Sequence, residues 1–169
     1  MRYRIVMLLT IVLGALLQQF LPTWPLFGGI KPPILAALTL YYALRRNAGE
    51  MWLAVFAAAL LQDGLDLGSF GPALIAFPVI GLLANRIRNE VFADGIFTQL
   101  FFGAVIGLFT TLIALFVYAV TGQRPLFFGL AVLRLVSSVL LGMATLPVVS
   151  QIVNRLEVFI PERRGYGWQ

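Results

Sequence analysis

The sequence predicts an all-α membrane protein, a six-transmembrane-helix bundle with both ends of the chain in the cytoplasm. Three observations support this fold class. Hydrophobic residues make up 60% of the 169 residues, which is more than a soluble domain of this size can bury. Charged residues make up only 11%, against about a quarter in ordinary globular proteins. The apolar residues form long runs, and the basic residues stand between these runs instead of clustering.

Six apolar runs are predicted to cross the membrane, because a bilayer core of about 30 Å needs about 20 helical residues, and fewer where flanking charges reach the interface. The predicted spans cover residues 5–21, 28–44, 51–67, 71–84, 96–120 and 126–153. The connectors are short, and no linker or internal repeat is visible. We therefore expect residues 1–169 to form a single integral membrane domain that ends in a cytoplasmic tail, 154–169.

The first two runs each carry a distinctive start. Arg2 and Arg4 precede the first run, as in a signal peptide, but no small-x-small cleavage site follows. We therefore expect this span to be retained. The second run is punctuated by Lys31-Pro32-Pro33.

A glycine-rich turn joins the third run to the fourth. The third run is interrupted near its end by Asp63 and Asp66, and Gly68 and Gly71 follow before Pro72. Glycine permits backbone geometries closed to other residues, and proline suits the first turn of a helix. The chain is therefore predicted to reverse tightly at the outer face, with the fourth span starting at Pro72.

The fifth run carries small residues at helical spacing, with Gly103 and Gly107 four residues apart and Thr111 on a compatible face. Small residues let helix backbones approach closely in a membrane, where no hydrophobic effect drives helix association. This stripe has two interpretations: contact inside the bundle, which we favour, or a docking face for a partner helix. The first and fifth spans are the expected partner faces.

Arg134 lies within the sixth run, about 13 Å below the outer surface by the helical rise, and Asp63 lies about 12 Å below the same surface. A charge at this depth costs about 2.5–3.5 kcal/mol or more and usually pairs inside the bundle. We therefore predict an intramembrane ion pair between Asp63 and Arg134. The alternative is that Arg134 reaches outward while Asp63 is solvated in the turn.

The basic residues set the expected orientation, because short cytoplasmic loops carry an excess of Lys and Arg. With the N-terminus inside, Lys31 and Arg124 lie outside and Arg134 lies within a span. The other nine basic residues fall in the cytoplasm: Arg2, Arg4, Arg45, Arg46, Arg86, Arg88, Arg155, Arg163 and Arg164.

The residues that are absent exclude most soluble-type chemistry. The chain has no Cys and no His, which removes disulfides, thiolate or imidazole metal sites and nucleophiles activated by histidine. No glycine-rich phosphate-binding loop is present. The net charge is +5, and the arginines are scattered between the apolar runs. This spacing is typical of residues that set the orientation of membrane spans, and not of a basic patch that binds nucleic acid. We expect no enzymatic activity, no cofactor and no metal.

An ordered set of motifs covers residues 31 to about 84. Lys31-Pro32 precedes a span, Tyr41-Tyr42 lies near its end, Asp63 ends the next span, and Gly71 follows eight residues later with Ala73-Leu74 beyond. This pattern resembles the bacterial rod-shape-determining MreD family, which carries Arg-Pro, an aromatic pair, Gly-x-x-x-Asp, and then Gly and Ala-Leu. Two positions depart from it, because Lys31 replaces Arg and Ala59 replaces the Gly before the Asp.

The resemblance implies a non-enzymatic scaffold of the cell-elongation machinery in the bacterial cytoplasmic membrane. Its implied partner is the bitopic protein MreC and, through MreC, the actin-like MreB and RodA with its transpeptidase, which synthesise peptidoglycan. The family is similar in fold to the substrate-binding subunits of vitamin uptake systems. The alternative function is therefore capture of a vitamin-like small molecule. Gln62, Asp63, Asp66 and Arg134, with Trp24 and Phe70, would then line an outer pocket.

Overall fold

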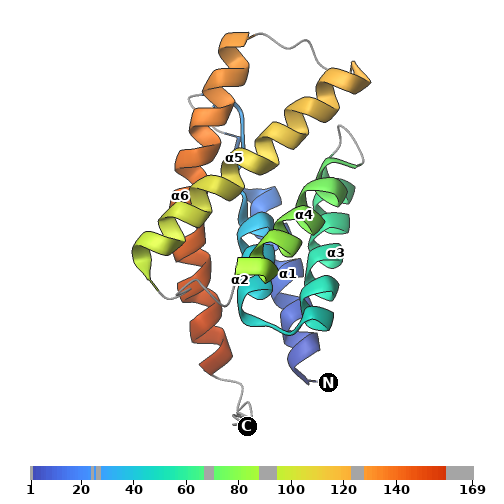
Figure 1. Ribbon diagram of the computed structural model, residues 1–169, viewed down its shortest axis with the longest axis vertical. Helices are drawn as coiled ribbons and strands as arrows, with labels where there is room; N and C mark the ends of the chain where they lie inside the picture. Colours follow the sequence, from blue (N-terminus) through green and yellow to red (C-terminus); the bar gives the residue numbers. More distant parts are fainter. Residues whose placement is uncertain are drawn as a thin grey trace.

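The protein is a bundle of α-helices that run alternately up and down (Figure 1), seen here in a computed structural model. The structure describes residues 2–23, 25, 28–66, 71–87, 95–122 and 128–158. Six helices lie in these ranges: α1 (Arg2–Phe20), α2 (Ile34–Arg45), α3 (Ala48–Leu65), α4 (Pro72–Ile87), α5 (Ile96–Thr121) and α6 (Phe128–Val158).

Five of these helices overlap their predicted spans with ends that differ by a few residues, but α2 begins at Ile34 instead of residue 28. Proline lacks a backbone N–H, and it disfavours helical geometry in the residue before it, so Pro32 and Pro33 delay the start of the helix. Gly28 and Gly29 take left-handed φ angles of 68° and 75°. Residues 28–33, the first part of the predicted second span, are therefore irregular backbone.

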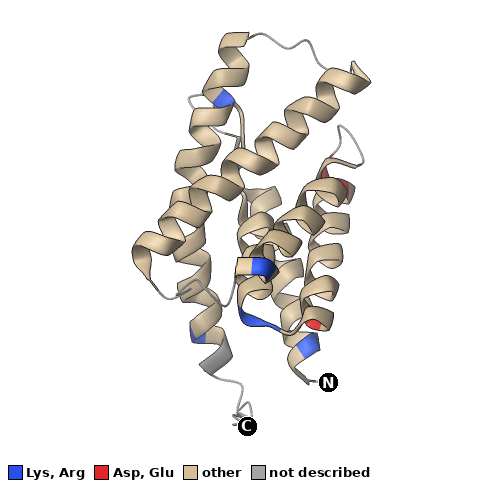
Figure 2. Ribbon diagram, in the orientation of Figure 1, with Lys and Arg blue, Asp and Glu red and all other residues tan. Residues whose placement is uncertain are grey.

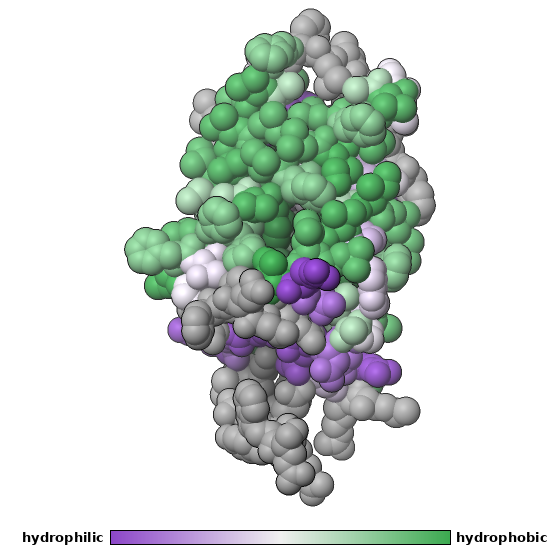
Figure 3. Space-filling view, viewed as in Figure 1, coloured by the Kyte–Doolittle hydropathy of each residue, from purple (hydrophilic) through white to green (hydrophobic). Residues whose placement is uncertain are grey.

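Within the part of the chain that the structure describes, three helices are long and apolar enough to cross a membrane: α1 over Tyr3–Phe20, α5 over Ile96–Thr121 and α6 over Phe128–Leu156. α2 and α4 are apolar but shorter, and α2 spans only about 18 Å at 1.5 Å per residue. Figure 3 shows a hydrophobic surface over most of the visible bundle, with hydrophilic residues gathered towards the end where α1 begins. The structure thus supports a helical membrane protein with three evident spanning helices.

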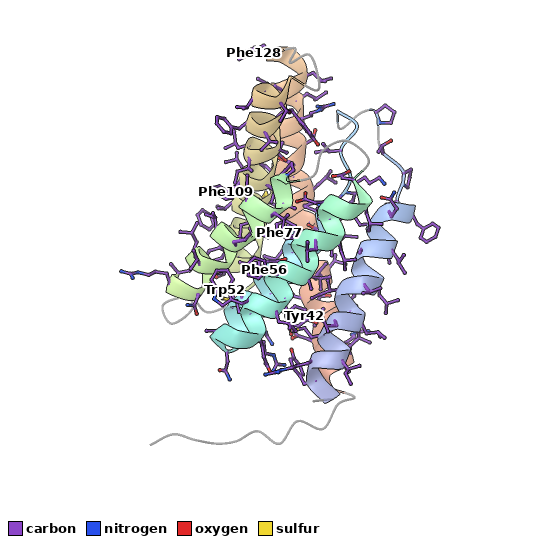
Figure 4. The ribbon with its side chains drawn as sticks, turned by 90° about the vertical axis from the view of Figure 1, so that its right-hand side faces the viewer. Tyr42, Trp52, Phe56, Phe77, Phe109 and Phe128 are labelled. Atoms are coloured by element: carbon purple, nitrogen blue, oxygen red, sulfur yellow. The ribbon has the colours of Figure 1, made fainter. Side chains whose placement is uncertain are left out.

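α2 is the central helix of the bundle. All residues from Ile34 to Ala43 are buried, and α2 packs against each of the other five helices. A helix that is hydrophobic all round is stable only when it is enclosed. Figure 4 shows Tyr42 of α2 and Phe77 of α4 within the bundle and Phe128 at the far tip of α6. The other five helices are therefore arranged around one buried helix.

α5 and α6 cross in backbone contact. A Cβ atom built on Gly103 would overlap the carbonyl oxygen of Gly142, and one on Gly107 would overlap the carbonyl oxygen of Ser138. This confirms the prediction that Gly103 and Gly107 pack helices inside the bundle. Their use as a docking face for a partner is wrong, because α6 covers both glycines. Thr111, one turn beyond Gly107, is partly buried.

Basic residues gather at the end of the bundle where α1 and α3 begin and where α2, α4 and α6 end (Figure 2), which we call the basic end. There Arg4 lies 3.8 Å from Glu50, and the Arg46 guanidinium lies 3.6 Å from the centre of the Tyr3 ring. The contacts join α1, α2 and α3 at a common level. Charged side chains therefore connect α1, α2 and α3 at this end of the molecule.

A second set of contacts at the basic end joins α2 to α6. The Tyr41 hydroxyl donates to Asn154 Oδ1 at 2.6 Å, and Arg45 Nη1 donates to the same oxygen at 2.8 Å. The Arg45 guanidinium also lies over the Tyr41 ring, 5.0 Å from its centre. The last turn of α2 is thus fixed to the C-terminal half of α6.

Candidate binding cavity

A cavity of about 380 Å³ lies at the end of the bundle opposite the basic end, and all six helices contribute to its lining. Its volume falls within the range of small-molecule sites, about 300–1,000 Å³. Among the described residues, four charged side chains line it: Lys31, Asp63, Asp66 and Arg134. Polar side chains complete the polar part of the lining: Gln18, Gln19, Thr23, Gln62, Thr110, Thr111, Tyr118 and Ser138.

Asp63 holds the start of α4 against the end of α3. Its side chain is 4% exposed. The carboxylate accepts backbone hydrogen bonds from Gly71 at 3.1 Å, Ala73 at 2.9 Å and Leu74 at 3.0 Å. The first N–H groups of a helix have no partner within the helix, and a negative charge at this position is favourable. Asp63 therefore caps α4 from a neighbouring helix.

Arg134 holds the loop between α1 and α2 against α6. Its Nε donates to the carbonyl oxygen of Gly28 at 3.1 Å. Gly28 has a φ of 68°, and a Cβ atom there would lie 2.9 Å from Arg134 Cγ. Glycine at position 28 therefore serves two purposes, because it permits the left-handed turn and leaves room for the arginine side chain.

The predicted ion pair between Asp63 and Arg134 is not formed. Both side chains line the same cavity, but Asp63 binds backbone N–H groups and Arg134 binds a backbone carbonyl. Within the described ranges, the ion pair present is Arg4–Glu50. The physical reason is that the open start of α4 supplies Asp63 with three donors, so the buried carboxylate needs no cation.

Gln18 is a site residue that the sequence analysis missed. Its amide nitrogen donates to Gln62 Oε1 at 2.7 Å, and its amide oxygen accepts from the Leu35 backbone N–H at 3.0 Å. Gln62 in turn donates to Asp66 at 3.3 Å. This network joins α1, α2 and α3 at the cavity. The available signal was the pair Gln18-Gln19, two amides near the end of a 17-residue apolar run, 5–21.

The remaining motif residues lie around the same cavity or outside the described chain. Lys31 Nζ donates to both the backbone oxygen and the side-chain oxygen of Gln19, each at 3.1 Å. The Pro32 carbonyl accepts from the Ile34 backbone N–H at 2.9 Å. Gly68, Trp24 and Phe70 lie outside the described residues.

Comparison of the chain with protein-family models, with curated proteins and with solved structures finds no match. Among the described residues, no three His, Cys, Asp or Glu side chains come together in a way that could hold a metal ion. The arrangement of the cavity is therefore interpreted from its own chemistry: a carboxylate engaged by backbone donors, two cationic side chains and a ring of amides and hydroxyls.

Proposed function

We propose that the chain is a non-enzymatic MreD-like scaffold of the bacterial cell-elongation machinery, held in the cytoplasmic membrane by six spans. The observation that carries the proposal concerns the motif with the most specific spacing. Asp63 accepts hydrogen bonds from the backbone of Gly71, Ala73 and Leu74, which are the positions that the resemblance pairs with the aspartate. The motif therefore has a physical purpose in this chain, to close the turn between α3 and α4.

The other motif residues also occupy places that the fold depends on. Tyr42 is 1% exposed in the core, and the Tyr41 hydroxyl binds α6 through Asn154. Lys31 fixes the segment before α2 to the end of α1. A scaffold needs a rigid bundle and no reactive side chain, and these contacts support that role.

The six-span arrangement is part of the proposal. α2 and α4 are short, but α2 is enclosed by its neighbours, and irregular backbone is tolerated at membrane depth where it lines a cavity. The segment Gly29–Lys31 before α2 lines the cavity. The alternating helices and the basic end support an orientation with the basic end in the cytoplasm.

The topology predicts opposite labelling of two introduced cysteines, and the chain has no cysteine of its own. Asn47 is exposed at the basic end, and Thr121 is exposed at the end of α5. In spheroplasts, a membrane-impermeant maleimide is expected to label Thr121→Cys at once and Asn47→Cys only after permeabilisation. The reverse result would invert the orientation, and labelling of both in intact spheroplasts would contradict the six-span arrangement.

The proposed partner is an MreC-like bitopic protein, which links the scaffold to an MreB-like actin homologue and to RodA with its transpeptidase. Because α6 covers the glycines of α5, we place the partner on the face of α1 that points away from the bundle. Leu9, Leu13 and Leu17 of α1 are 57%, 53% and 57% exposed. A single transmembrane helix packs against such a face by van der Waals contact.

Co-purification tests the scaffold and its partner face together. The full chain, co-expressed with an MreC-like bitopic protein, is expected to retain it through purification in mild detergent. Leu13→Trp on α1 should reduce the retained partner about fivefold or more, the effect of losing an important contact. Leu140→Trp is the matched control on α6, with 54% exposure. No complex with the unaltered chain would overturn the scaffold, whereas equal loss in both variants would move the partner away from α1.

A second candidate function, capture of a small molecule, is favoured by one observation, the cavity of about 380 Å³. Its lining combines apolar side chains with polar groups of the kind that orient a ligand. Native mass spectrometry of the chain purified without a partner distinguishes the candidates. A capture protein should carry a stoichiometric vitamin-like molecule, whereas a scaffold should not.

A further inference from the structure

Two cationic side chains in the cavity are held by neutral partners. Arg134 uses Nε to bind the Gly28 carbonyl, and among the described residues its two terminal nitrogens have no acceptor. Among the same described residues, Lys31 binds the two oxygens of Gln19 and no carboxylate. Both side chains are partly buried and line the cavity. Their charges are therefore available to a ligand.

The two acidic side chains of the cavity do not neutralise these cations. Asp63 is occupied by three N–H groups at the start of α4, where the helix dipole offsets its charge. Asp66 is exposed and accepts from Gln62. Within the described ranges, neither carboxylate lies within ion-pair distance of Lys31 or Arg134, since the ion pair found there is Arg4–Glu50.

The fold brings the two cations to one segment of chain. Arg134 of α6 is bound to Gly28, and Lys31 is three residues further along the same loop. Three residues span at most about 11 Å between Cα atoms. The bond from Nε to Gly28 fixes the guanidinium plane. The edge of the guanidinium formed by its two terminal nitrogens, with two parallel N–H donors, remains for an anion. Such a fork matches the oxygens of a phosphate group.

We propose that this cavity binds a phosphate group, with Arg134 as the principal contact and Lys31 as the second. The apolar part of the lining, which includes Leu35, Phe77 and Leu115, covers the remainder of the ligand. The phosphate belongs either to the headgroup of a membrane lipid or to a soluble phosphate ester. The site does not depend on the proposed scaffold function, because it needs only this chain.

The test uses the full chain purified in a non-ionic detergent without a partner. Three probes are titrated: dioctanoyl phosphatidylglycerol, glycerol 3-phosphate and dioctanoylglycerol, which has the same acyl chains and no phosphate. Binding is measured by isothermal titration calorimetry and by the shift in melting temperature. Arg134→Gln is expected to weaken binding of the phosphate probe about tenfold or more, the usual effect of losing a hydrogen bond to a charged group. Arg155→Gln removes an exposed arginine at the basic end and should leave the affinity unchanged.

The outcomes separate the two sources and leave the proposal open to refutation. Saturable binding of phosphatidylglycerol alone identifies a lipid headgroup, and binding of glycerol 3-phosphate identifies a soluble phosphate. Equal affinities of Arg134→Gln and Arg155→Gln would overturn the proposal, as would equal binding of dioctanoylglycerol or no saturable binding. If Arg134→Gln does not fold, Lys31→Gln decides, because an unchanged affinity in that variant also overturns it. Failure here leaves the partner result untouched, and loss of the partner leaves this site untouched.

Discussion

Replacing Gly107 with alanine is expected to lower the free energy of unfolding by about 1–3 kcal/mol or more, the usual cost of forcing an extra carbon into a packed interface. The new Cβ atom would overlap the Ser138 carbonyl oxygen. A backbone atom cannot rotate aside, so α5 and α6 must separate along their whole crossing. The measurement is thermal unfolding of the purified chain in detergent.

Gly129→Ala is the matched control. Gly129 lies in α6, and a Cβ atom there would have no atom within 4 Å. Alanine favours a helix over glycine by up to about 1 kcal/mol, so this variant should be neutral or slightly more stable. If both variants change stability equally, the close crossing of α5 and α6 is not what the glycine serves.

Replacing Asp63 with alanine is expected to cost about 2–4 kcal/mol of stability, because three backbone donors at the start of α4 lose a charged acceptor. Asp66→Ala should cost less than about 1 kcal/mol, since Asp66 is exposed and accepts a single bond of 3.3 Å. Both variants remove a carboxylate, and the two positions lie three residues apart at the end of α3. Folded yield and thermal unfolding in detergent compare them directly.

A double-mutant cycle shows whether Asp63 acts through Arg134. Because the two side chains bind different backbone groups, the effects of Asp63→Ala and Arg134→Ala should add to within about 0.5 kcal/mol. A coupling well above this value would restore the ion pair and contradict the role of Asp63 as a helix cap.

The sequence predicts the positions of most helices well, because each long apolar run coincides with a helix. It predicts the start of α2 poorly. The predicted span extends through residues 28–33, although Lys31, Pro32 and Pro33 punctuate it, and proline and left-handed glycine decide the backbone there. Hydropathy indicates whether a segment is buried in the membrane or the protein, whereas proline and glycine decide whether that segment is helical.

The partners of buried charges are harder to predict. Asp63 and Arg134 have opposite signs and similar expected depths, which favours a pair in the absence of other partners. The open N–H groups of α4 and the free carbonyl of Gly28 are equally good partners, and no side-chain pattern displays them. The spacing of eight residues between Asp63 and Gly71 in the motif reflects the contact between Asp63 and the start of α4. Gln18 was missed because the amide pair Gln18-Gln19 shows that a polar site lies near the end of the first run but does not show which groups its amides bind.

The placement of α2 has a consequence for how the chain is made. Gly28 and Arg134 are 106 residues apart, and Tyr41 and Asn154 are 113 apart. During synthesis α2 leaves the ribosome long before α6, so the Gly28 carbonyl in the loop before α2 and the Tyr41 hydroxyl in the last turn of α2 have no partner on α6 at that stage. We therefore expect the nascent protein to lack these two contacts until α6 has been made.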